Sequence, residues 1–202
     1  CQRRSELEVD LHPLPGAEDT AHAMAEFIVE RHRRNLVSAE GTTTDELLGR
    51  TLTERGLSVA TAESCTGGLL SGRLIDRAGS SAYVLGGAAV YANSAKTGVL
   101  GVPAELIEEH GSVSPEVARA LADGARERFG ADIGIGITGV AGPGGGTEAK
   151  PVGYVCFCVT TADGQVIARD PQFAGSRADV RERSVDTAMH LLLRAAGGLP
   201  PR

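Results

Sequence analysis

The stretch LSVATAESCTGG, residues 57–68, passes from a run of small and β-branched residues into a pair of glycines. Residues 57–60 are typical of a short buried strand, and the segment after Gly68, LLSGRLI, is typical of the start of a helix. Ser64 is therefore predicted to lie where a strand ends and a helix begins. In α/β sheets this edge is where ligands bind, and the N-terminus of the following helix offers unpaired N–H groups.

This turn has both a functional and a structural interpretation. Gly67 and Gly68 allow a ligand to approach the backbone closely, and the Ser64 hydroxyl can act as a nucleophile if a base takes its proton. A helix cap followed by glycines for packing explains the same pattern. The octapeptide from Thr61 to Gly68 does not decide between the two.

Length and composition predict one globular core. The chain has 202 residues, of which 42% are hydrophobic and only 3% aromatic, so Ala, Val, Leu and Ile must fill the core. The net charge of −6, without a basic run, disfavours nucleic acid as a partner. No apolar run reaches the roughly 18–20 residues that span a bilayer, so we expect no membrane partner and a cytoplasmic location.

The cysteines predict neither a disulfide framework nor a metal centre. Cys156 and Cys158 alternate along an expected strand and share one face, but no second His or Cys cluster accompanies them. We expect buried thiols without a metal, as in a reducing compartment. Cys1 stands where a native chain begins with Met, so we expect a truncated or processed start.

Strands and helices alternate along the chain, which predicts an α/β fold, a three-layer α/β/α sandwich. The sheet is expected to be mixed and mostly parallel, with one antiparallel hairpin at the Asp-Gly turn of residues 163–164. The expected later strands are residues 82–91, 133–139, 153–161 and 165–173, and the expected helices are 43–56, 67–77, 103–109 and those starting at Ser114 and Ser176.

Residues 1–42 are expected to form an extension that differs from the domain at residues 43–198. The segment from Cys1 to Asp19 is polar and contains prolines, which predicts extended or partly disordered chain. A short helix is expected over Thr20 to Arg34. Its apolar stripe consists of Met24, Phe27 and Ile28.

Tyr91 and Lys96 are candidates to assist a serine nucleophile. Tyr91 ends the second expected strand, and Lys96 lies five residues further on, in a loop or the first turn of a helix. A lysine can serve as the base when burial lowers its pKa, and a neighbouring tyrosine can relay a proton or hold the lysine in place. A solvated surface lysine is the alternative.

Two neighbours of Ser64 compete for roles in this chemistry. Glu63 is a possible second base, or a partner of Lys96 or Arg73 that only holds geometry. Cys65 is a rival nucleophile, because a helix N-terminus lowers the pKa of a thiol.

The glycine-rich segment GVAGPGGGT, residues 139–147, follows the third expected strand. Such a loop can form a nest of N–H groups for an anion, although it matches no standard nucleotide fingerprint. Lys150, after the loop, and Arg177, near the start of the last helix, are either phosphate ligands or ordinary surface cations.

Three stretches together resemble the CinA C-terminal domain family, the nicotinamide-nucleotide amidohydrolases. They are residues 62–68 (AESCTGG), residues 91–96 (YANSAK), and residues 139–145 (GVAGPGG) followed by residues 150–153 (KPVG). The resemblance extends from about Asp45 to Ala196. Residues 1–42 match no motif of the family, and the separate N-terminal domain of full-length CinA proteins is missing, so a stand-alone form is expected.

The resemblance implies a homodimer that hydrolyses the carboxamide of nicotinamide mononucleotide, its small-molecule substrate, to nicotinate mononucleotide and ammonia. This reaction recycles pyridine nucleotides in NAD metabolism, and the family needs no cofactor or metal for it. Ser64 is similar to the family's nucleophile, Lys96 to its general base and Tyr91 to an assisting residue. The implied substrate-binding residues are Thr66, Gly67, Gly68, Ser81, Gly142, Gly144, Gly145 and Arg177. Among these, Arg177 is the implied phosphate ligand, and N–H groups of residues 66–68 are the implied oxyanion donors.

The main alternative is a nucleotide-binding module of the same family without hydrolase activity, which binds nucleotide but releases no ammonia. An amidase for a related amide is a second alternative. A DNA-linked role is a third, which the acidic charge disfavours.

Overall fold

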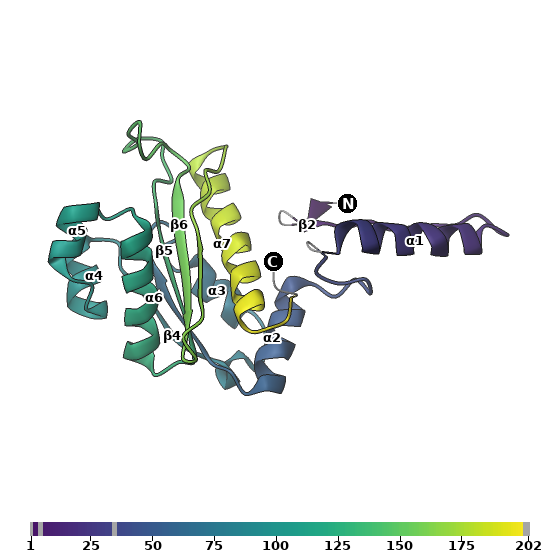
Figure 1. Ribbon diagram of the computed structural model, residues 1–202, viewed down its shortest axis with the longest axis horizontal. Coiled ribbons are helices and arrows are strands. Elements are labelled where there is room, and N and C mark those ends of the chain that lie inside the picture. The colour runs from purple at the N-terminus through teal and green to yellow at the C-terminus, as the bar shows by residue number, and fades with distance from the viewer. Residues whose placement is uncertain (1, 4–5, 34–35, 200–202) are drawn as a thin grey trace.

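The computed structural model describes residues 2–3, 6–33 and 36–199. A five-stranded mixed sheet in the order β4-β3-β5-β6-β7 lies between two layers of helices (Figure 1). Its strands are β3 (Val59–Glu63), β4 (Val84–Ala89), β5 (Ile133–Gly139), β6 (Val155–Thr161) and β7 (Val166–Arg169). The expected α/β/α sandwich is confirmed.

Each face of the sheet carries its own helices. On one face α6 (Pro115–Phe129) packs on β5, β6 and β3, with α4 (Asn93–Leu100) and α5 (Ala104–His110) beside it. On the other face lie α3 (Leu69–Ile75) and α7 (Arg177–Ala195), and α2 (Thr44–Arg55) packs against α7. Each of α2 and α7 starts in a capping box, at Thr43 and Ser176 respectively.

The strand directions decide which loops meet. β3 is parallel to both β4 and β5, so the carboxyl ends of these three strands share one edge of the sheet. The hairpin of β6 and β7 is confirmed, and β6 is also antiparallel to β5. This second antiparallel pair was not expected. It follows from the β5–β6 connection, which contains no helix, whereas parallel neighbours need a crossover segment.

Glycines in β5 allow α6 to lie directly on the strand backbone. A Cβ atom at Gly134 would lie 2.1 Å from the carbonyl oxygen of Ala122, and one at Gly136 would lie 2.1 Å from that of Ala118. Any side chain at these positions would push α6 away from the sheet. In this strand the glycines therefore face α6, and the isoleucines point to the core on the other face of the sheet.

The N-terminal segment contains β1 (Gln2–Arg3), β2 (Glu6–Leu7) and α1 (Glu18–His32). The expected helix is confirmed and starts two residues earlier, while Arg34, like Cys1, lies outside the described residues. No residue of α1 is buried, and Phe27 is 64% exposed, because α1 lies beside the layers rather than between them (Figure 1). Among the described helices, none has the length and apolar character that crossing a membrane requires.

Candidate active site

Ser64 and Tyr91 lie at the edge where the parallel strands end. The N–H of Ser64 donates to the carbonyl of Ile137 in β5, at 2.9 Å. The N–H of Val90, just after β4, donates to the carbonyl of Glu63, at 2.8 Å. These two bonds continue the strand pairing beyond the ends of β3 and β4. The residues that follow β3, β4 and β5 therefore lie next to one another.

Glu63 holds the turn after Ser64 to the first turn of α3. Its side chain is fully buried, and its carboxylate accepts hydrogen bonds from the N–H groups of Gly68, Leu70 and Ser71, at 3.0, 3.1 and 2.8 Å. The hydroxyl of Ser71 donates a fourth bond, at 2.6 Å. This carboxylate therefore caps the helix N-terminus, where negative charge is stabilised.

This arrangement corrects two interpretations from the sequence. Glu63 does not pair with Lys96 or Arg73, since its oxygens accept the helix N–H groups instead. The N–H of Gly68 donates to the carboxylate of Glu63, so it does not point toward a substrate oxyanion. Among the implied oxyanion donors, the N–H of Gly67 has no hydrogen-bond partner within the described residues.

Replacing Glu63 with glutamine is expected to lower the free energy of unfolding by about 1–3 kcal/mol, because an amide nitrogen would face backbone N–H donors in a buried site. Urea denaturation followed by circular dichroism measures the change. The matched control is Glu54→Gln on the exposed surface of α2, which should stay within about 0.5 kcal/mol of the native protein. Equal stabilities of the two variants would contradict the capping role.

Lys96 lies in the first turn of α4 and is buried, with 2% of its surface exposed. Its ammonium group donates to the backbone carbonyl of Tyr91, at 3.1 Å. Burial lowers the pKa of Lys96, and the nearby Cys65 offsets part of this shift. The alternative of a solvated surface lysine is therefore wrong, and the side chain has the environment that a lysine base needs.

Cys65 is not a thiolate under ordinary conditions. Its side chain is buried, and burial raises the pKa of the thiol to about 12, although the N–H groups of Cys65 and Thr66 act in the opposite direction. The effect of the helix N-terminus is outweighed by the loss of solvent. The thiol stays protonated, which disfavours Cys65 as the rival nucleophile.

Arg177 connects Tyr91 with the glycine-rich loop. Its guanidinium donates to the carbonyl oxygen of Gly142, at 2.9 Å, and to the hydroxyl of Tyr91, at 3.3 Å. Tyr91 therefore contacts Lys96 through its backbone carbonyl and Arg177 through its phenol hydroxyl. Tyr91 itself is 65% exposed. The structure brings Arg177, Gly142 and Tyr91 together at the strand ends.

Because Tyr91 contacts Lys96 through its backbone carbonyl, Tyr91→Phe is expected to leave Lys96 in place. If the chain acts as we propose below, kcat should fall less than about tenfold, because the lost contact to Arg177 is one hydrogen bond. Steady-state ammonia release at varied substrate concentration gives kcat and KM separately. A loss of kcat as large as that caused by removing Lys96 would instead assign the phenol a proton-transfer role.

Arg181 is a residue of this site that the sequence reasoning missed. From α7 its guanidinium donates to the carbonyl oxygens of Cys65 and Thr66, at 3.1 and 2.9 Å. These bonds orient the two peptide groups after Ser64. The available signal was its spacing, since Arg181 follows Arg177 by four residues and shares its helix face.

Thr66 adds an unpaired polar atom to the turn. Its side chain is fully buried, and its hydroxyl oxygen has no hydrogen-bond partner among the residues described. A buried polar group without a partner costs about 1–3 kcal/mol.

The remaining candidate residues differ in where the structure places them. Ser81 is exposed in the short helix η1 (Ser80–Ala82) before β4. Because β3 and β4 are parallel, Ser81 lies at the amino ends of these strands, whereas Ser64 lies at their carboxyl ends. Gly144 and Gly145 belong to the exposed part of the loop, while Gly142 is buried. Lys150 donates to the carbonyl of His110 at the end of α5, at 2.6 Å, so it anchors the loop.

No set of three or more His, Cys, Asp or Glu side chains within the described ranges is arranged as metal ligands. The expected buried thiols are present, since Cys156 and Cys158 are free and buried against α6.

The fold and the site define an α/β protein whose polar side chains gather at the carboxyl ends of parallel strands. The sequence profile described as the CinA C-terminal domain matches residues 41–196. The chain belongs to the CinA C-terminal domain family.

Curated relatives align with nearly the whole chain. It is similar to a CinA-like protein of Mycobacterium sp. (strain MCS), at 55% identity over 195 residues, which are 96% of this chain and 46% of that protein. It is also similar to a CinA-like protein of Mycobacterium tuberculosis (strain ATCC 25177 / H37Ra), at 48% identity over 99% of this chain and 46% of that protein. The chain spans about half the length of these relatives. Alignments of 195 and 200 residues include most of residues 1–42.

Solved structures agree with the fold. The competence/damage inducible protein CihA from Agrobacterium tumefaciens is similar with a TM-score of 0.72 and 40% identity, over 76% of this chain and 95% of that one. A competence-damaged protein (CinA) superfamily protein from Klebsiella pneumoniae is similar with a TM-score of 0.72 and 35% identity, over 77% of this chain and 99% of that one.

Proposed function

We propose that this chain hydrolyses the carboxamide of nicotinamide mononucleotide to nicotinate mononucleotide and ammonia. The observation that carries the proposal is the burial of Lys96, whose pKa is lowered, at the strand ends beside the Ser64 turn. A buried lysine without a carboxylate partner is costly, and supplying a neutral amine for proton transfer is a reason to keep one. Membership of the CinA C-terminal domain family, which is associated with this activity, supports the choice of reaction.

In the proposed mechanism, the neutral amine of Lys96 takes the hydroxyl proton of Ser64 as the serine oxygen forms a bond to the carboxamide carbon. The N–H of Gly67 donates to the developing oxyanion. The carbon–nitrogen bond then breaks, and the leaving nitrogen departs as ammonia with the proton from Lys96. Water attacks the resulting ester, gives a proton to Lys96 and releases the carboxylate, and the proton returns to Ser64.

Substrate recognition is proposed to rest on one further side chain. Arg177 is the proposed phosphate ligand, because its guanidinium is suited to phosphate and lies where the glycine-rich loop meets the strand ends. Ser81 is left out of this site, since it lies at the amino ends of the parallel strands.

Ammonia release from nicotinamide mononucleotide by the 202-residue chain tests the proposal directly. Release by the native protein supports the amidohydrolase. Saturable nucleotide binding without release would favour the binding module, and release only from other amides would favour a different amidase. The implied homodimer and cytoplasmic location stay predictions, and sedimentation velocity tests the first of these.

A further inference from the structure

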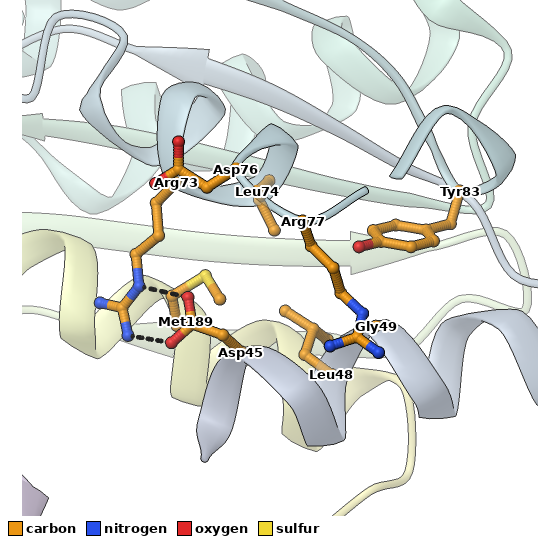
Figure 2. A pocket seen from close by; sticks show the side chains of 9 residues that line it. All are labelled: Asp45, Leu48, Gly49, Arg73, Leu74, Asp76, Arg77, Tyr83 and Met189. Atoms are coloured by element: carbon orange, nitrogen blue, oxygen red, sulfur yellow. Dashed lines mark hydrogen bonds and ion pairs between the residues drawn. The ribbon is translucent and has the colours of Figure 1, made fainter. Parts of the chain in front are cut away.

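A cavity of about 240 Å³ lies between α2, α3 and Tyr83, the residue before β4 (Figure 2). The carbonyl of Tyr83 accepts a hydrogen bond from the N–H of Val59, the first residue of β3, at 2.7 Å. The cavity therefore lies at the amino ends of the parallel strands, whereas Ser64 lies at their carboxyl ends. It is separate from the candidate active site. Its apolar wall consists of Leu48, Leu74 and Met189, each at most 3% exposed.

Two polar groups converge over α2 at this cavity. A Cβ atom on Gly49 would lie 3.0 Å from Cδ of Arg77 and 3.1 Å from the hydroxyl oxygen of Tyr83. Figure 2 shows the phenol hydroxyl directed at the side chain of Arg77, whose guanidinium points toward α2 at Gly49. Within the described part of the chain neither group has a hydrogen-bond partner, although Tyr83 is only 5% exposed. The hydroxyl oxygen is not among the fully buried unpaired atoms, so it keeps accessible surface toward the cavity that Tyr83 lines.

The charges of the lining leave Arg77 as the cation that can meet a ligand. The guanidinium of Arg73 is already bound by Asp45, at 2.8 Å for both bonds, and by Asp186, at 2.5 Å. Arg77 has no ion pair with any described residue. The carboxylates of Asp45 and Asp76 in the same lining disfavour a ligand with more than one negative charge.

We propose that this cavity binds a compact organic monocarboxylate, whose carboxylate accepts hydrogen bonds from Arg77 and Tyr83 and whose apolar body lies on Leu48, Leu74 and Met189. An arginine beside a neutral hydroxyl donor matches the acceptor oxygens of a carboxylate. The cavity is smaller than the roughly 300–1,000 Å³ of sites for drug-sized ligands, which limits the ligand to about the size of a single ring or a short branched chain.

Titration of the 202-residue chain with benzoate, isovalerate and the neutral benzamide, followed by NMR of backbone amides, tests this proposal. Benzoate or isovalerate should bind saturably and shift the amides of Gly49, Arg77 and Tyr83, while benzamide should bind more weakly. Arg77→Met should weaken carboxylate binding about tenfold or more, and Tyr83→Phe should weaken it about fivefold.

The matched control is Arg50→Met, which removes an exposed cation one residue from Gly49 on α2 and should leave binding unchanged. A melting curve for each variant identifies any loss of folding. Arg77→Met and Tyr83→Phe test the two proposed carboxylate contacts independently. The proposal is overturned if neither carboxylate binds saturably, if benzamide binds as tightly, or if Arg77→Met behaves like Arg50→Met. None of these outcomes depends on hydrolase activity.

Discussion

Replacing Ser64 with alanine is expected to lower kcat for ammonia release from nicotinamide mononucleotide by about 10⁴-fold or more, with KM changed little. The variant lacks the oxygen that would form the covalent ester, and removing a nucleophile costs the largest part of such catalysis. The fold should persist, because the Ser64 N–H bond to Ile137 does not depend on the side chain. The measurement is steady-state ammonia production, with nucleotide binding followed by calorimetry.

The matched control for Ser64→Ala is Thr53→Ala on α2, which removes a hydroxyl that donates to the carbonyl of Gly49, at 2.7 Å, away from the strand ends. It should keep native activity. A single turnover of native enzyme, quenched and analysed by mass spectrometry, should show an acyl adduct on the peptide containing Ser64. An alanine variant with native kcat would exclude Ser64 as the nucleophile, and residual binding without turnover would separate loss of chemistry from loss of the site.

Replacing Lys96 with methionine is expected to abolish ammonia release while raising stability near neutral pH. Methionine has a similar length but cannot take a proton, so kcat should fall by about 10³-fold or more. The native lysine is almost fully buried, and its lowered pKa shows that the folded protein disfavours its charge. Removing that group removes an unfavourable burial, so lost activity would accompany a higher melting temperature.

The pH dependence follows from the direction of the pKa shift. In the unfolded chain Lys96 has its ordinary pKa of 10.5, and in the folded chain its pKa is lower. Between these two values the unfolded state binds more protons, so the stability of the native protein rises with pH through that window and is lowest below it. The stability gain of Lys96→Met should therefore be largest at the lower pH and shrink as the pH approaches 10.5.

Native activity should rise with pH through the lowered pKa of Lys96, because only the neutral amine accepts the proton of Ser64. Lys96→Arg keeps the positive charge but cannot become neutral in the working range, so it should be as inactive as Lys96→Met. Measurable activity in Lys96→Arg would assign the residue an electrostatic role.

The stability gain of Lys96→Met is measured by denaturing the native protein and this variant at two pH values.

Local sequence patterns predicted much of the fold correctly. The helix starts at Thr43 and Ser176, the strand at residues 133–139 and the turn at Ser64 are read from neighbouring residues, and the structure has each of them where it was expected. Propensity, caps and turns depend on contacts within a few residues. Where the patterns fell short, as in the second antiparallel strand pair, the missing information was the path of the chain between elements.

The sequence by itself determined that this protein is an α/β domain of the CinA C-terminal family with a serine turn at a strand end. Only the tertiary structure decided what surrounds that serine. Lys96 is buried, Glu63 caps α3, Cys65 stays protonated and Arg181 holds the turn because elements distant in the chain pack there. Ser81 lies at the opposite ends of the strands from Ser64 because β3 and β4 are parallel. Burial and strand direction arise from long-range packing, which local patterns do not encode.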